Sequence, residues 1–247
     1  MAARRQSLDV VTDDSVQGVG ARCMRVSSPG NIQTVWRINT DNMQSKKNKN
    51  SERSRVTREA LIRTAHTLFK TKGYSDTGTE EIVQSAGVTR GALYHHFQDK
   101  EALFVAVLET AERELADTIE KAGAAQADPW QKLRAGYEAF LDSCMDPAVR
   151  RIILLDAPSV LGMKRWRNVD ANYGLGLISR VLEALMAAGY IQAQPVKPLA
   201  HLLLGALSEA GLMIASAEDV HAAREEVGAC LDGLLKSLRI RQAQKEP

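Results

Sequence analysis

Residues 79–104, TEEIVQSAGVTRGALYHHFQDKEALF, contain two short amphipathic segments joined by a glycine turn. The apolar inner faces of the two segments consist of Ile82, Val83, Val88, Leu93 and Phe97. Gly87 can adopt the positive φ that a sharp turn requires. Two short helices joined by a tight, Gly-containing turn form the helix-turn-helix unit. The stretch therefore predicts an all-α, DNA-binding N-terminal domain.

Capping signals define the ends of these helices. Thr77, with Glu80 three residues on, has the capping-box spacing, so we expect Thr77 to be the N-cap of the first short helix. Thr89 stands at the N-cap position of the second, whose free backbone N–H groups and positive dipole end suit a phosphate. Arg90 follows it, and its planar guanidinium fits a guanine edge or a phosphate.

The outward residues of this region indicate a DNA-reading surface when they are taken together. Each alone is better explained as part of a solvated helix face. The predicted contacts are Thr77, Thr79, Thr89, Arg90, Gly91, Ala92, Tyr94, His95, His96 and Lys100. Small residues let the helix sit close in the groove, while the hydroxyl, imidazole and ammonium groups donate to phosphates.

A basic segment precedes the helix-turn-helix. Its cations are Lys46, Lys47, Lys49, Arg53, Arg55, Arg58 and Arg63, opposed only by Glu52 and Glu59. This pattern predicts an arm that follows the DNA backbone or enters the minor groove, with Arg55 as a contact. A solubilising tail is the alternative.

Residues 1–43 lack any sustained period, so we expect a disordered extension. Met43 directly precedes the basic segment, and we hypothesise that translation starts there. Residues 44–98 are then the DNA-binding domain, and residues 99–247 a larger helical domain. Helices are expected from about residue 52, from about Asp99 to Lys121, and then at 129–145, 147–156, 159–168, 171–188, 196–216 and 219–239. No strands are expected.

Charge and cysteine content narrow the class of protein. The net charge of the 247 residues is only +2, so a nucleic-acid signal must come from local patterning. Cys23, Cys144 and Cys230 are far apart and show neither a disulfide framework nor zinc-ligand spacing, which fits a reduced cytoplasmic setting. The N-terminus lacks the apolar core of a signal peptide, and we find no catalytic motif. We therefore expect no enzyme activity, cofactor or metal.

The sequence GYSDTGTEEIVQSAGVTRGALYHHFQDKEALF resembles the N-terminal domain of the tetracycline-repressor (TetR) family of bacterial regulators. The resemblance runs from about Ser54 to Leu103. It rests on LYHHF, on Lys100 three residues after Phe97, and on Ala-Gly-Val at the turn. One departure is Gly78, where the family usually carries Ser or Thr.

This resemblance implies a homodimer that binds palindromic double-stranded DNA, with one recognition helix for each half-site. It also implies a C-terminal domain that binds a small-molecule effector and dimerises through its last two long helices. Members mostly repress transcription, and the effector moves the dimer to a spacing that does not fit DNA. The identity of the effector and the operator sequence stay open.

The C-terminal residues agree in part with this implication. Apolar residues surround the helix at 196–216 and form a stripe on the one at 219–239, which indicates pairing with a second copy or, alternatively, an intramolecular core. The pocket candidates are Tyr137, Phe140, Trp166, Tyr173, His201 and Glu209; the aromatic ones are otherwise core residues. We expect Glu209 to be buried, with either an internal partner or a ligand.

Two further possibilities concern the whole protein. Residues 198–217 approach the length of a membrane span, roughly 20 apolar residues. Because His201 and Glu209 interrupt them, we expect instead a soluble protein's helix that is buried on most sides, and no membrane partner. The second functional hypothesis is a DNA-bound structural or division-control protein of the same fold, whose C-terminal surface binds a protein and encloses no cavity.

Overall fold

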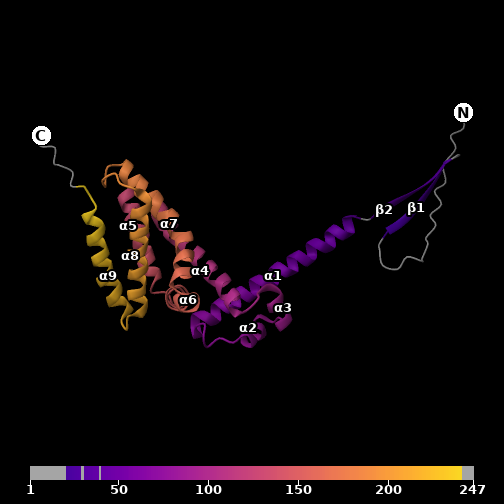
Figure 1. The fold of residues 1–247 in the computed structure, drawn as a ribbon, viewed down its shortest axis with the longest axis horizontal. Coiled ribbons are helices and arrows are strands. Elements are labelled where there is room, and N and C mark those ends of the chain that lie inside the picture. The colour runs from indigo at the N-terminus through magenta and orange to yellow at the C-terminus, as the bar shows by residue number, and fades with distance from the viewer. Residues whose placement is uncertain (1–20, 29–30, 39, 241–247) are drawn as a thin grey trace. The chain divides into compact units, whose positions relative to one another are not determined.

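A computed structural model describes residues 21–28, 31–38 and 40–240, with side-chain positions from residue 51 onward (Figure 1). The chain divides into two compact units, residues 1–57 and 58–247, which are described separately. The second unit contains all of the helices that follow α1.

The first unit begins with an antiparallel pair of strands, β1 (Ala21–Ser28) and β2 (Asn31–Ile38), in which Ala21 lies opposite Ile38. The sequence analysis did not predict these two strands, and the disordered extension of residues 1–43 stays a prediction. Their β-branched and aromatic residues favour strands, and the prediction gave these too little weight. Residues 1–20, 29–30 and 39 lie outside the described residues, and the translation start at Met43 stays a prediction.

Helix α1 (Thr40–Lys72) starts well before the predicted residue 52, so the basic segment is helical. It ends at Lys72, and the next residue, Gly73, has a positive φ of 84°. In the second unit, the end of α1 packs with α2 (Thr79–Ala86) and α3 (Arg90–His96) around fully buried apolar side chains. These include Leu61, Phe69, Ile82 and Leu93. The predicted helix-turn-helix is confirmed, including Gly87 at φ 66°.

One capping prediction is confirmed and one is wrong. The Thr89 hydroxyl accepts a hydrogen bond from the Ala92 amide at 3.2 Å. Thr77, in contrast, is not the N-cap of α2: Gly78 occupies that position, without a side-chain cap. The Thr77 side chain is buried, and its hydroxyl donates to the Gly73 carbonyl at 2.7 Å. The turn that follows α1 therefore uses the hydroxyl that the capping box would have needed.

The remaining helices form the C-terminal bundle (Figure 1). They are α4 (Lys100–Ala124), α5 (Pro129–Ser143), the π-helix η1 (Val149–Asp156), α6 (Ala157–Leu161), α7 (Met163–Ala187), α8 (Val196–Ser216) and α9 (Val220–Ser237). Helix α4 packs on α5 and α7, α7 on α8, and α8 on α9. The predicted break between 168 and 171 does not exist, because α7 starts directly after Gly162 at φ 75° and continues to Ala187.

The described residues thus confirm the fold class from α1 onward: a helix-turn-helix domain followed by a larger helical bundle. The hairpin of β1 and β2 is the exception.

Gly87 provides a test of the turn. Its Cβ position is open, with no atom within 4 Å, so only the left-handed backbone at φ +66° disfavours a side chain. We predict that Gly87→Ala lowers the free energy of unfolding by about 1 kcal/mol, measured by urea denaturation. Gly78→Ser is the matched control, because that site is equally open but has φ −88°. Equal effects of the two substitutions would contradict the assignment of the turn.

Candidate nucleic-acid interface and interior cavity

Helix α3 presents an exposed polar face. The Arg90 guanidinium pairs with the Glu80 carboxylate of α2 at 2.7 Å, with both side chains exposed, and lies 5.6 Å from the centre of the Tyr94 ring. Because an exposed ion pair contributes little free energy, Arg90 can exchange Glu80 for a phosphate or a base edge. Tyr94 and His95 are also exposed.

The other predicted DNA contacts divide by exposure. Thr89 and Gly91 are exposed, and Thr79, Ala92, His96 and Lys100 are half-buried. Burial, with His95 and Arg58 nearby, lowers the pKa of His96. The Lys100 ammonium lies 4.1 Å from the centre of the Tyr74 ring, and burial lowers its pKa as well. Lys100 thus begins α4 in contact with the loop that follows α1.

Thr77 is removed from the predicted surface because it is buried and its hydroxyl is used within the turn. In the first unit, Arg55 is exposed and donates to Glu52. The side chains of Lys46, Lys47 and Lys49 lie outside the residues whose side chains are described. The role of the basic segment in binding DNA stays a prediction.

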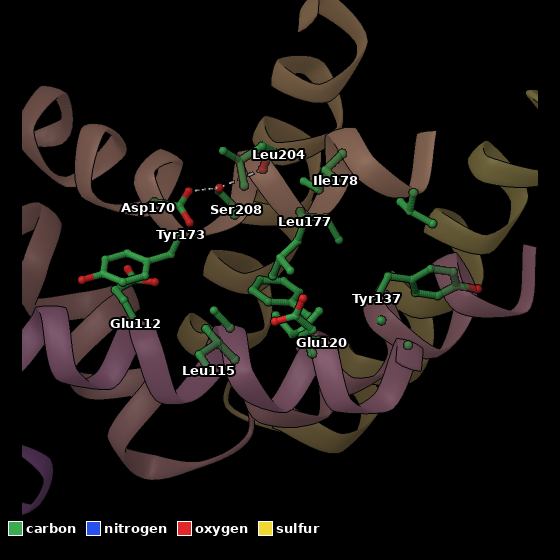
Figure 2. Close-up of a pocket in the computed structure, with 18 of the residues that line it drawn as sticks. Glu112, Leu115, Glu120, Tyr137, Asp170, Tyr173, Leu177, Ile178, Leu204 and Ser208 are labelled. Carbon is green, nitrogen blue, oxygen red and sulfur yellow. Dashed lines mark hydrogen bonds between the residues drawn. The ribbon is translucent and has the colours of Figure 1, made fainter. Parts of the chain in front are cut away.

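The bundle contains a partly open cavity of about 360 Å³, lined by α4, α5, η1, α7 and α8 (Figure 2). Most of its wall is aliphatic and aromatic. Four of the six predicted pocket residues line it, namely Tyr137, Phe140, Trp166 and Tyr173. Phe140 packs beside Gly211 of α8, where a Cβ would come within 3.1 Å of its ring, so the helices are closely apposed there.

His201 and Glu209 are the two pocket candidates that the structure places elsewhere. Both are exposed on α8, outside the residues that line the cavity, so the expectation of a buried Glu209 is wrong. Helix α8 is apolar on nearly every side, and its sequence therefore does not indicate which side faces the bundle. The side that contains Ser208 and Leu204 faces the cavity.

The cavity has an acidic end, which the sequence analysis missed. Glu112 on α4 is only 3% exposed, and its Oε1 has no hydrogen-bond partner among the described residues. Burial, and secondarily the charge of Asp170 on α7, raise the pKa of Glu112 to about 8. Burial also raises the pKa of Asp170, whose Oδ2 accepts a hydrogen bond from Ser208 at 2.8 Å. Figure 2 shows these groups at the opposite end from Tyr137.

Periodicity contained a signal for both carboxyl groups. Glu112 lies on the stripe formed by Leu108 and Leu115, at spacings of four and three residues. Asp170 follows Trp166 by four residues and precedes Leu177 by seven. An acid inside an apolar helical stripe is expected to be buried. The only acid predicted to be buried was Glu209, in the helix at 196–216.

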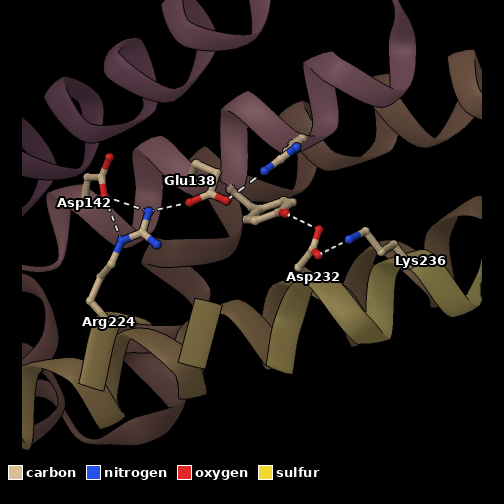
Figure 3. Close-up of polar contacts among 7 residues, drawn as sticks. Glu138, Asp142, Arg224, Asp232 and Lys236 are labelled. Carbon is tan, nitrogen blue, oxygen red and sulfur yellow. Dashed lines mark hydrogen bonds and ion pairs between the residues drawn. The ribbon is translucent and has the colours of Figure 1, made fainter. Parts of the chain in front are cut away.

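Polar contacts connect the other end of the cavity to α9 (Figure 3). The Tyr137 hydroxyl donates to Asp232 at 2.9 Å, and desolvation raises the pKa of Tyr137 to about 12. Further along the same two helices, Arg224 donates to Asp142 at 2.8 Å and also pairs with Glu138. Tyr137, a residue of the cavity wall, is thus hydrogen-bonded directly to α9.

The π-helix η1 joins the cavity wall to the end of α1. Its residues Ile153 and Leu154 line the cavity. Asp156, at its end, accepts a hydrogen bond from the Tyr74 amide at 2.7 Å and pairs with Arg151 at 3.5 Å. Gly73 makes the close approach possible, because a Cβ there would lie 2.2 Å from the Arg151 guanidinium.

Helices α8 and α9 leave large apolar side chains exposed, including Leu202, Met213 and Leu234. Helix α8 is long and apolar enough to cross a membrane, yet only 33% of its most apolar window is buried within the chain. A single chain therefore does not bury α8 on most of its sides. Leu202 alone is 72% exposed, so another surface outside this chain is expected to bury this apolar face.

The buried carboxyl of Glu112 predicts a pH-dependent stability. Its folded pKa of about 8 lies above the ordinary 4.5, so the stability that the protonated form provides is complete at low pH and is lost as the pH rises through 8. At pH 7 we expect Glu112→Gln to raise the free energy of unfolding by about 2–3 kcal/mol. The difference should grow between pH 5 and 8 in urea titrations.

Glu120→Gln is the control, since Glu120 also lines the cavity but is exposed and paired with Arg180 at 2.8 Å. This substitution should change stability little at any pH. A Glu112→Gln effect that does not vary with pH would contradict the burial of an ionisable carboxyl.

Comparison with known proteins gives matches over both parts of the chain. Residues 61–107 match the family model for bacterial regulatory proteins of the tetR family, and residues 130–238 match the tetracyclin repressor-like C-terminal domain. A crystal structure of a TetR-family transcriptional regulator from Pectobacterium atrosepticum is 32% identical, with a TM-score of 0.70. That match covers 77% of this chain and 97% of the other.

Two curated proteins extend the comparison. The Transposon Tn10 TetC protein of Escherichia coli is 24% identical over 193 residues, which are 78% of this chain and 98% of that protein. The HTH-type transcriptional regulator AcrR of Shigella flexneri is 34% identical over 107 residues, which are 43% of this chain and 50% of that protein. With the helix-turn-helix and the bundle in the same order, the chain belongs to the TetR family of DNA-binding transcriptional regulators.

Proposed function

We propose that this regulator is a repressor that binds a palindromic operator as a homodimer and is released when a small molecule occupies the cavity. The observation that carries the proposal is the continuity between the cavity wall and the DNA-binding domain. Helix α4 and η1 each line the cavity and each contact the α1–α2 corner. A curated relative is described as a probable acrEF/envCD operon repressor, at 41% identity over 80 residues.

The DNA surface of the proposal is the exposed face of α3 with its capped N-terminus. Thr89 caps the first turn through the Ala92 amide, which leaves the N–H groups of Arg90 and Gly91 as the ones that could contact a phosphate. Arg90, Tyr94 and His95 then supply a forked cation, a hydroxyl and an imidazole on the same exposed face. The half-buried Ala92 and the exposed Gly91 add no bulk between the helix and a groove.

The dimer interface of the proposal is the exposed apolar face of α8 and α9. In a two-fold symmetric dimer, this face packs against the same face of the second copy. That contact would bury the exposed side chains of Leu202, Met213 and Leu234 without a membrane or a different protein. Gly205 and Gly233, both exposed and with no atom near their Cβ positions, would allow close approach of a second copy. In this arrangement, the Tyr137–Asp232 bond connects each cavity to the interface.

Release follows from the positions of α4 and η1. A ligand that pushes on Ile153 or Leu154 moves the helix that contains Asp156, and Asp156 is bonded to the Tyr74 amide. The side chain of Arg151, also on η1, lies against Gly73 and donates to the Lys72 carbonyl at 3.4 Å, which adds a second contact between η1 and the end of α1. The cavity of about 360 Å³ within the bundle supports a ligand-responsive regulator over the structural or division-control alternative.

The recognition helix is tested by Arg90→Ala. We predict a loss of operator affinity of roughly 1–3 kcal/mol and relaxed preference at one base position, measured by fluorescence anisotropy at fixed salt on an operator selected from random DNA. Glu80→Gln is the matched control: it removes the partner of Arg90 and one negative charge, so it should keep or tighten binding. Parent-like affinity of Arg90→Ala would show that α3 does not read the bases.

The coupling is tested at Asp156, which lies away from the exposed face of α3. Asp156→Ala leaves the Tyr74 amide without its acceptor, so we expect the free energy of unfolding to fall by about 1–3 kcal/mol. Operator affinity should also fall several-fold. Asp156→Asn retains an acceptor oxygen and should lie closer to the parent in both measurements. Unchanged operator affinity in a folded Asp156→Ala dimer would refute this route.

A further inference from the structure

We propose that the cavity takes a cationic amphiphile, an organic ammonium compound with an aromatic or alkyl body, whose positive charge lies against Glu112 and Asp170. The inference rests on the proposed function in one respect, that the cavity is the effector site. The chemical class of the ligand is argued independently, from the charges and surfaces of the cavity wall.

Glu112 is the starting point. Its carboxyl is almost completely buried and lines the cavity, and Oε1 has no partner among the described residues. A buried carboxylate is strongly unfavourable unless a cation or hydrogen-bond donors accompany it. In Figure 2, Glu112 rises from α4 beside Tyr173 and Asp170 of α7. The neighbour that acts on it electrostatically is a second acid, which makes this end of the cavity complementary to a cation.

The cations of the cavity wall lie at its other end. Arg180 already pairs with Glu120, which follows Glu112 by eight residues, about 12 Å along α4. Lys132 is exposed at the start of α5, where its carbonyl lies near Gly123, still further along α4. At the Glu112 end, Figure 2 shows Asp170 and Tyr173 of α7, with Ser208 of α8 bonded to Asp170.

The other elements that pack on α4 add no charge at that end. From η1 the wall contains Ile153 and Leu154, and from α5 its titratable members are Lys132 and Tyr137. Among the wall residues described, Glu112 therefore has no protein cation within its own end of the cavity. A ligand cation would fill that role.

The rest of the wall suits the body of an amphiphile. Aromatic rings attract a cation through their faces, and Trp166, Tyr173 and Phe140 provide such rings. The Trp166 indole nitrogen is itself buried without an acceptor in the described structure, so it can also donate to a polar atom of the ligand. Away from the acidic end, Leu115, Ile119 and Leu177 provide an apolar surface for a ring or chain.

Binding of a cation should release a proton. Because the pKa of Glu112 is about 8 in the empty cavity, its carboxyl is mostly neutral at pH 7. A bound ammonium favours the carboxylate, so the proton leaves to solvent as the ligand enters. Affinity for a cation therefore rises with pH and levels off above about 8. A neutral ligand that accepted a hydrogen bond from protonated Glu112 would show the opposite trend.

Three soluble probes share a phenylbutyl body and differ in the charge of the head group, so they separate the contributions of charge and apolar body to binding. They are 4-phenylbutylamine, 4-phenylbutan-1-ol and 4-phenylbutyrate. In isothermal titration calorimetry of the full-length dimer at pH 7, we expect the amine to bind at least about tenfold more tightly than the alcohol, and the butyrate not to bind. Equal affinities, preference for the butyrate, or binding of none of the three would overturn the inference.

Variants of the two acids and a pH series test whether the ligand's positive charge lies at Glu112 and Asp170. Glu112→Gln should remove most of the amine's advantage over the alcohol while leaving alcohol binding unchanged, and Asp170→Asn should remove part of it. Glu120→Gln is the control and should change neither. Amine affinity should rise about tenfold from pH 6 to 7, with close to one proton released at pH 7, measured in buffers of different ionisation enthalpy. Retention of the full advantage in Glu112→Gln would contradict the site.

Operator release is measured separately, so the two proposals can fail independently. Alcohol and amine that bind equally and both release the operator would overturn the cation inference and support the effector cavity. Amine binding that depends on Glu112 but leaves operator affinity unchanged would support the cation site and contradict the release mechanism.

Discussion

Helix α4 is the constraint on which the rest of the structure depends, because a single continuous helix belongs to two cores. Near its start, Leu103 and Phe104 are fully buried, and Lys100 lies on Tyr74. Two turns later, Glu112 and Leu115 line the cavity. The helix has 25 residues, about 37 Å of rigid rod. Packed cores do not deform continuously, and the proposed release depends on α4 carrying a shift at the cavity to the DNA-binding domain.

A second physical theme is the imbalance of charge inside the bundle. Folding buries Glu112 beside Asp170 with no cation at that end among the wall residues described, and burial keeps the Glu112 carboxyl mostly protonated at pH 7. A ligand cation would favour the carboxylate instead. The hydrogen bond from Tyr137 to Asp232 connects the cavity wall to α9, and η1 connects it to the end of α1.

The sequence predicted α2, α3 and the start of α4 to within a residue or two, because Gly87, Thr89 and Asp99 specify local geometry by themselves. It placed the start of α1 about twelve residues too late, since the polar, basic segment has no apolar period to mark it as a helix. It predicted four aromatic residues of the cavity wall correctly, since large side chains on inner faces have few other places to lie. It failed at Glu209 because an all-apolar helix does not reveal its inner side. Thr77 was misassigned because a nearby carbonyl competed for its hydroxyl, a tertiary detail that spacing does not contain.

The central claim is that an occupied cavity and a bound operator exclude each other. Filling the cavity from within tests it without any ligand: Leu177 points into the cavity in Figure 2, and Leu177→Trp adds bulk there. Ala187→Trp, exposed on the same helix, is the control. Circular dichroism and sedimentation first verify that both variants are folded dimers. Operator affinity, measured by fluorescence anisotropy, should then fall at least about tenfold for Leu177→Trp and stay at the parent value for Ala187→Trp. Parent-like affinity of a folded Leu177→Trp dimer would contradict the account.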